Sequence, residues 1–216
     1  VSGSSLTANN LRLGSDTGST GTVTVDSGAT INLTDTVQVG QDSATANTLT
    51  IGAGGTVNAH TAIIATNTGS NGTANVSGAG AQLNLSGLFP TTGTDQDGAV
   101  LVVGRNGTGT LNINAGGTIT IAPAPSFGTG LTGGLLIGGS SASPTGTGNG
   151  TVNVDGAGSS IVFSNANGQA GNTQVGRDGT GVLNITNGAS VDGSTQGLAI
   201  VGRLIGSTGT VNVTGA

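Results

Sequence analysis

Two stretches of the chain are nearly the same text: "VGRNGTGTLNINAGGTITI" at Val103–Ile121 and "VGRDGTGVLNITNGASV" at Val175–Val191. In both, small apolar residues alternate with Thr or Asn, and glycines interrupt the alternation. A period of two residues predicts half-buried β-strands. A near-copy further along the chain indicates an internal repeat, so the repeat period decides the fold.

The five-residue core of these stretches recurs seven times, ending each time in an alternation of apolar and polar residues. Its copies are Gly21–Val25, Asn47–Ile51, Gly72–Val76, Gly109–Ile113, Gly150–Val154, Gly181–Ile185 and Gly209–Val213. The first apolar positions of successive copies are 26, 25, 37, 41, 31 and 28 residues apart. We interpret the shortest steps as the basic unit and the longer ones as loop insertions.

Most repeats carry two further strand-like pieces. One precedes the core and usually ends in an apolar residue plus Gly: Leu11–Gly14, Val37–Gly40, Leu101–Gly104, Leu135–Gly138, Thr173–Gly176 and Ala199–Gly202. The other follows the core: Thr30–Leu33, Thr56–Ala59, Gln82–Leu85, Thr118–Ile121, Ser160–Phe163 and Ser190–Gly193. Between core and following piece, the apolar positions lie six apart, as in Val25 and Ile31, or seven apart, as in Val76 and Leu83. These corners need a residue with positive φ, which Gly supplies at no steric cost.

Three short strands in about 25 residues predict one coil of a parallel β-helix. A lone coil cannot bury its inner residues or pair its backbone, whereas stacked coils do both for one another. The sequence therefore predicts an all-β parallel β-helix of about seven to eight coils, each with three short strands. Residues 1–216 form a single segment. Because "VSGSSL" (Val1–Leu6) and "VNVTGA" (Val211–Ala216) resemble incomplete coils, we expect part of a longer solenoid or a stackable subunit.

Composition argues against several classes of protein. The chain contains 44 Gly and no Cys, Met, Trp or Tyr, and only 6% of its residues are charged. Its net charge of −5 gives no basic surface for nucleic acid. The longest apolar runs are a few residues, so we expect no membrane insertion by this segment.

The repeats resemble the passenger-associated repeats of bacterial autotransporters and the related repeats of PEP-CTERM exosorted proteins. The resemblance lies in V-G-x-x-G-T-G-x-L-x-I-x-x-G-x-x-V, at Val103–Ile119 and Val175–Val191, and in G-S-T-G-T-V-x-V-x-G-A, at Gly206–Ala216. It covers nearly the whole chain and is clearest from Leu101 onward. It implies a right-handed winding and an extracellular or cell-surface location, often with adhesive or biofilm roles.

The sequence contains few of the residues that an enzyme active site would need. A polysaccharide-active β-helix would use clustered Asp residues and aromatics, but the nine Asp are scattered and Trp and Tyr are absent. The single histidine, His60, is expected on a turn and leaves no nucleophilic triad. We expect a protein that is not an enzyme and needs no cofactor. The fragment Asp95-Gln96-Asp97-Gly98 is a weak candidate for Ca²⁺, and otherwise a solvated turn.

Two sets of polar residues should form columns on the solenoid surface. Arg105, Arg177 and Arg203 each follow an apolar-Gly corner, so they should share one edge, either binding an anion or glycan or supplying solubilising charge and cross-coil pairs. The core copies place polar residues outward in two columns, from Thr22 and Thr24 to Thr210 and Asn212, with Val182 interrupting the first. A regular Thr ladder would suit ice binding, but Asn replaces Thr in most of the second column. A hydrogen-bonding ladder for glycans or another solenoid is the alternative.

In the later coils, long connections run from the piece that follows the core to the first piece of the next coil. They should all leave the solenoid at the same corner. They carry most of the large apolar loop residues: Leu88, Phe89, Pro90, Pro123, Pro125, Phe127 and Leu131. These residues either cover one another as a small satellite core or form a contact patch for a partner.

The leading hypothesis is a non-enzymatic structural or adhesive segment of a bacterial surface protein, serving as a stalk or in adhesion or biofilm. Its partners would be neighbouring solenoid segments, other copies of itself, or surface glycans or matrix. One alternative is an extracellular filament or matrix subunit that polymerises end to end through open coil edges. The other is a polysaccharide-active enzyme.

Overall fold

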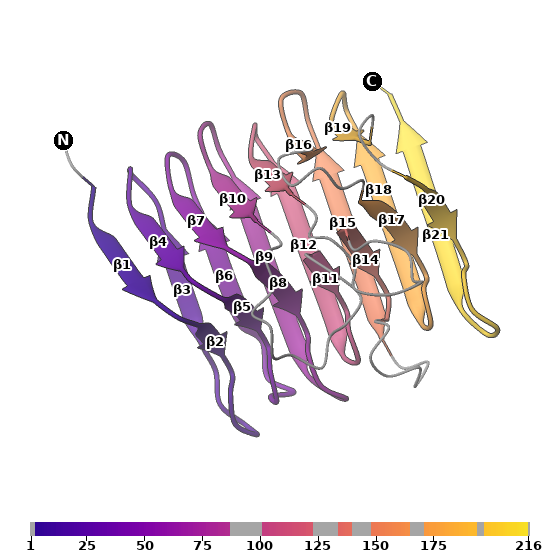
Figure 1. Cartoon of the computed structure of the whole chain (residues 1–216), viewed down its shortest axis with the longest axis horizontal. Coiled ribbons are helices and arrows are strands. Elements are labelled where there is room, and N and C mark those ends of the chain that lie inside the picture. The colour runs from indigo at the N-terminus through magenta and orange to yellow at the C-terminus, as the bar shows by residue number, and fades with distance from the viewer. Residues whose placement is uncertain are drawn as a thin grey trace.

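The chain folds into three parallel β-sheets of seven strands each (Figure 1). The computed structural model describes residues 3–86, 101–122, 134–139, 148–164, 171–193 and 197–215. Successive strands belong to different sheets, so three strands make one coil and the chain returns to the same sheet every third strand. The predicted all-β parallel β-helix is confirmed, with seven coils. The right-handed winding stays a prediction.

We name each sheet after its first strand. The β1 sheet contains β1 (Ser5–Ala8), β4 (Thr30–Leu33), β7 (Thr56–Ala59), β10 (Gln82–Leu85), β13 (Thr118–Ile121), β16 (Ser160–Phe163) and β19 (Ser190–Asp192). The β2 sheet contains β2 (Leu11–Leu13), β5 (Thr36–Val39), β8 (Thr61–Ile64), β11 (Leu101–Val103), β14 (Gly134–Ile137), β17 (Asn172–Val175) and β20 (Ala199–Val201). The β3 sheet contains β3 (Thr22–Val25), β6 (Asn47–Ile51), β9 (Asn71–Ser77), β12 (Thr108–Asn114), β15 (Asn149–Asp155), β18 (Thr180–Thr186) and β21 (Thr208–Thr214).

Strand register places equivalent residues of successive coils directly above one another. In the β3 sheet, Leu111 pairs with Ala74 on one side and Val152 on the other, and all three side chains are buried. The same holds in the other two sheets, so the inward residues of all three merge into one apolar core. The repeat of small aliphatic residues in the sequence therefore corresponds to columns of side chains that run along the solenoid.

The corner after each β2-sheet strand requires positive φ. Gly104 has φ 70°, and a Cβ built on it would lie 2.1 Å from the carbonyl oxygen of Asn149 in the next coil. In the third coil Ala65 takes this position with φ 60°. The missing glycine is why the sequence analysis identified no first piece in that coil, where the structure has β8.

The corner between the β3 sheet and the β1 sheet has two forms, which match the two spacings in the sequence. In three of its four copies the six-residue form places a non-glycine residue and then a glycine at positive φ, as in Ala115 (φ 51°) and Gly116 (φ 85°), whereas the corner after Ile51 has only Gly54 (φ 72°). The seven-residue form uses two glycines, as in Gly156 (φ 85°) and Gly158 (φ 84°). Positive φ at these corners is thus confirmed, but its adoption by Ala115 was not predicted.

A short apolar strip lies on the outward face of the β2 sheet. Val102 points away from the core that its neighbours Leu101 and Val103 enter, and it pairs with Ile63 and Leu136 of the adjacent coils. These three residues form a separate buried cluster. This sheet is therefore apolar on both faces in its central coils, whereas the other two present mostly polar residues outward.

We predict that replacing a core side chain with a smaller one in the middle of the solenoid destabilises the fold. Replacing fully buried Leu111 with alanine removes side-chain contacts with two neighbouring coils and should lower the free energy of unfolding by about 2–5 kcal/mol. Denaturant unfolding followed by circular dichroism measures the change. Thr110→Ala, one residue away and facing outward, is the control and should cost less than about 1 kcal/mol. Equal losses in the two variants would contradict the inward and outward assignment.

Candidate functional surfaces

The outward face of the β3 sheet carries a column of threonines. Thr48 pairs with Thr22 and Thr73, and the column continues through Thr110 and Thr151. Val182 then interrupts it before Thr210. The register therefore confirms the expected outward column, including its interruption.

A second column on this face consists of asparagines in the last five coils. The side-chain amide of Asn112 donates to Asn75 Oδ1 at 2.9 Å, and Asn153 donates to Asn112 Oδ1 at 2.8 Å. Asn184 and Asn212 extend the ladder with bonds of 2.7 and 2.8 Å. Replacement of Thr by Asn does not disrupt the column; instead it links the coils through their side chains. We call this set the β3-sheet ladder.

A shorter ladder runs along the outward face of the β1 sheet. Asn58 donates to Asn32 Oδ1 at 2.8 Å, and Asn84 donates to Asn58 Oδ1 at 3.0 Å. Thr120 follows Asn84 in the same column. The sequence analysis missed this β1-sheet ladder, although its signal was present as Asn at the same position of three successive repeats.

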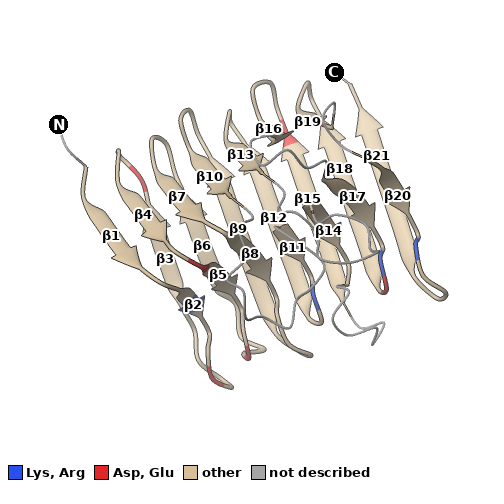
Figure 2. Cartoon of the chain, viewed as in Figure 1, with Lys and Arg blue, Asp and Glu red and all other residues tan. Residues whose placement is uncertain are grey.

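Arg105, Arg177 and Arg203 lie at the same corner of the solenoid, as expected, and Figure 2 shows basic residues along this edge. The backbone N–H of Arg105, Arg177 and Arg203 each donates to the carbonyl of the positive-φ residue one coil earlier, at 3.0, 3.0 and 2.9 Å. Gly139 occupies the same column between Arg105 and Arg177. Arg203 Nη1 donates to Gln174 Oε1 at 2.9 Å, which is a cross-coil pair.

Charge on this edge is not uniform along the solenoid, and Figure 2 shows acidic residues at it in the first coils and basic residues further along. Asp16, Asp42 and Asp178 each lie two residues after a positive-φ glycine of this corner, whereas the three arginines follow such a glycine directly. Arg177 and the adjacent Asp178 are mostly buried, so the edge does not present three equivalent exposed cations. Binding of an anion or glycan at these arginines stays a prediction.

At another corner, Asp155 is held by the next coil. Its carboxylate accepts hydrogen bonds from the Thr186 hydroxyl at 2.5 Å and the Asn187 amide at 2.7 Å. These donors, Thr186 first, lower the pKa of Asp155 below its ordinary value of 3.8 because they stabilise the ionised form. The interaction therefore serves to join two coils through the ionised carboxylate.

Several residues singled out from the sequence lie outside the described residues. They are the candidate Ca²⁺ ligands Asp95 and Asp97 and the loop residues Leu88, Phe89, Pro90, Pro123, Pro125, Phe127 and Leu131. In the described ranges, no group of three or more His, Asp or Glu side chains is placed to hold a metal ion. The same part of the chain has no helix that could cross a membrane. His60 occupies the bend between β7 and β8, as expected.

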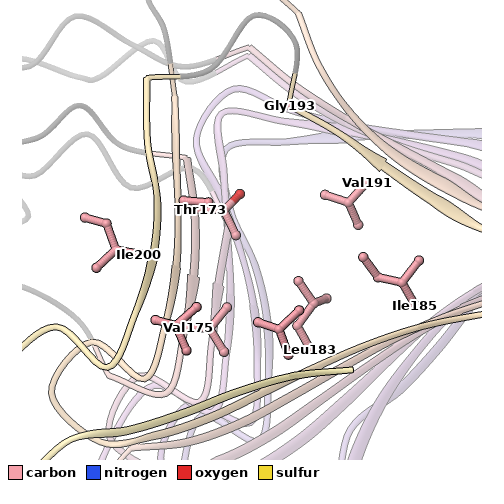
Figure 3. Close-up of a pocket in the computed structure, with 10 residues that line it drawn as sticks. Thr173, Val175, Leu183, Ile185, Val191, Gly193 and Ile200 are labelled. Carbon is pink, nitrogen blue, oxygen red and sulfur yellow. The ribbon is translucent and has the colours of Figure 1, made fainter. Parts of the chain in front are cut away.

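The last two coils line an apolar hollow of about 190 Å³ that is partly open to solvent. Figure 3 shows Val175, Leu183, Ile185 and Val191 among the side chains that face it. These residues belong to the core columns and do not form a polar, convergent site. The hollow therefore belongs to the core at the C-terminal end of the solenoid, and its lining is mostly apolar.

We predict that the β3-sheet ladder contributes to stability. Replacing Asn153 with alanine removes one donated and one accepted side-chain bond, so the free energy of unfolding should fall by about 1–3 kcal/mol. Chemical denaturation measures the loss. Thr151→Ala on the same strand and face has no ladder bond and serves as the control. If the two variants unfold at the same denaturant concentration, the ladder does not stabilise the solenoid.

Searches with the chain against protein-family models, curated proteins and solved structures returned no match. Its function is therefore argued from its own residues and geometry.

Proposed function

We propose that this chain is a stiff structural segment of an extracellular bacterial surface protein, acting as a stalk or adhesive element. The observation that carries the proposal is the continuity of three seven-stranded parallel sheets around one apolar core. Each coil is hydrogen-bonded to its neighbours on all three sides, so bending the rod would stretch backbone bonds in at least one sheet. Such a rod holds its outward columns in fixed positions.

The surface supports contact rather than catalysis. The outward residues on two sheets are short neutral side chains, mostly Thr and Asn, and they are arranged in columns that repeat from coil to coil. Repeated neutral hydrogen-bonding groups suit weak, multiple contacts with extended partners such as another solenoid or matrix glycans. The likeness of Val103–Ile119 and Val175–Val191 to surface-protein repeats supports the extracellular location.

The stiffness can be measured with two spin labels. Because the chain has no cysteine, Thr22→Cys and Thr210→Cys would provide unique labelling sites at the two ends of one outward column. Six coil steps of about 4.8 Å separate them, so pulsed electron paramagnetic resonance should give a narrow distance distribution near about 29 Å. The flexible linkers of the spin labels broaden this distance distribution modestly. A broad distribution under native conditions, with circular dichroism still showing β-structure, would contradict a stiff segment.

A second candidate function, a filament or matrix subunit, rests on the surfaces of the first and last coils. Leu6 is 50% exposed in the first coil, and Val201 and Val213 are 51% and 71% exposed in the last. Any coil stacked there, from the same chain or from another copy, would bury these core-column residues. Stacking the last coil of one copy on the first coil of another would also bring Arg203 near Asp16, of opposite charge.

The filament candidate predicts association that depends on concentration. Sedimentation velocity of the 216-residue chain should show species that grow with protein concentration, and Val213→Asp should prevent growth by placing a charge in the stacked core. Thr24→Asp, on the outward face of the first coil, is the matched control and should still associate. A chain that stays monomeric at every concentration tested would leave only the stalk or adhesive function.

A further inference from the structure

One core column of the β2 sheet begins with a large residue and ends with a small one. Its members, from the first coil to the last, are Leu11, Val37, Ala62, Leu101, Leu135, Thr173 and Ala199. The partly open hollow of about 190 Å³ lies at the C-terminal end of this column, and Thr173 and Ala199 both line it. The last coil therefore leaves space where the first coil carries a leucine.

Elsewhere in this column an alanine is covered by a leucine. Leu101 pairs with Ala62 of the adjacent coil, and the two side chains are 0% and 2% exposed. Ala199 has the same place in the last coil but is exposed, and so is Val201, which also faces inward on this strand. A leucine stacked on Ala199 would repeat the contact between Leu101 and Ala62 and would enter the hollow.

The first coil carries a leucine at the equivalent place. Leu11 lies three residues before a corner glycine with positive φ, and Ala199 lies three residues before another. Leu11 is only half-buried, and Leu6, its inward counterpart in the β1 sheet, is 50% exposed. Stacking the first coil of a second copy in register on the last coil would therefore place Leu11 on Ala199 and Leu6 on Val191.

The loops between the β2 and β3 sheets also match in the first and last coils. The step from the corner glycine to the outward threonine column is eight residues in both, but six in the coil before the last. In the first coil the Asp16 N–H donates to Ser19 Oγ at 3.2 Å, and that hydroxyl donates to the Asp16 carbonyl at 2.6 Å. Leu204 and Ser207 form the same turn in the last coil, with distances of 3.2 and 2.7 Å. At this corner the last coil thus resembles the first coil more closely than its own neighbour in the chain.

Loops of equal length already stack on one another within the chain. The second coil also has the eight-residue step, and its Asp42 N–H donates to the Gly14 carbonyl of the first coil at 2.9 Å. A first coil placed on the last coil can form the same type of bond at this corner. The stacked loops would also bring the carboxylate of Asp16 near Arg203, of opposite charge.

We propose that a second copy of this chain stacks in register on the last coil, with its Leu11 inserted into the hollow beside Ala199. This inference rests on the filament candidate above and specifies its contact. The first coil of one copy continues all three sheets of the other, so Thr22 of one copy lies next to Thr210 of the other. Slipping by one residue would turn the inward residues outward, which is why the apolar columns fix the register.

Cysteine cross-linking tests the register. In stacked copies of Thr22→Cys/Thr210→Cys, the two Cα atoms lie on adjacent strands about 4.8 Å apart, within the range of a disulfide, so mild oxidation should give a series of covalent oligomers. In the matched variant Thr24→Cys/Thr210→Cys, the pair is two residues out of register and about 8 Å apart, and at least about tenfold fewer oligomers should form. Thr110→Cys/Thr151→Cys, an adjacent pair within one chain, gives the reference rate for a pair in register.

Exchanging the sizes of the two contacting side chains tests the insertion. Ala199→Leu fills the hollow from within the same chain and should weaken association at least about tenfold in sedimentation velocity. Adding Leu11→Ala should restore association to within about threefold, because the leucine and the alanine have only exchanged places. Adding Leu6→Ala instead removes a leucine elsewhere in the first coil and should not restore it.

The outcomes distinguish this inference from the filament candidate. Association without cross-linking of Thr22→Cys/Thr210→Cys, or with equal cross-linking of the out-of-register pair, overturns the proposed register and leaves the filament candidate standing. Failure of Leu11→Ala to restore association overturns the insertion of Leu11. A chain that never associates contradicts both proposals and leaves the stalk or adhesive function. The cysteines lie on the outward face, so the cross-linking result does not depend on how the core variants fold.

Discussion

Backbone hydrogen bonding between successive coils is the constraint on which this structure depends. A strand of three to seven residues cannot pair within its own coil, because its coil neighbours lie in different sheets. Each N–H and C=O of an inner strand must therefore find its partner one coil away. The in-register stacking of equivalent residues is a direct consequence, since parallel strands of a repeating chain pair position by position.

The same register acts on both faces of each sheet. Inward, it stacks aliphatic side chains, and the solenoid has one continuous apolar core as a result. Outward, it stacks identical polar side chains, and where these are asparagines they hydrogen-bond along the axis. Because equivalent residues stack one above another, a residue type that recurs once per coil forms an outward column with one side chain per coil. The outward surface therefore consists of columns and of breaks in them, such as Val182 in the threonine column.

The sequence predicted the strands well because each coil has to satisfy the same physical conditions. Gly104 and Gly176 sit at the same corner, and alternating residues such as Leu111 and Ile113 identify the inward face. The prediction missed β8, because Ala65 adopts positive φ where the other described coils have glycine. Local sequence could not reveal this, since the backbone of neighbouring coils imposes the conformation.

By itself, the sequence determined the period, the strands and corners of most coils and the choice of inward residues, since alternation and glycine placement are local properties. Only the tertiary structure decided which residues of different coils contact one another. The amide ladders, the burial of Arg177 and Asp178 and the outward apolar strip at Val102 all join residues that lie at least a full coil apart in the chain or pack against such residues. Those contacts depend on how the insertions and corners of each coil align the next one, and a pattern within one repeat does not contain that information.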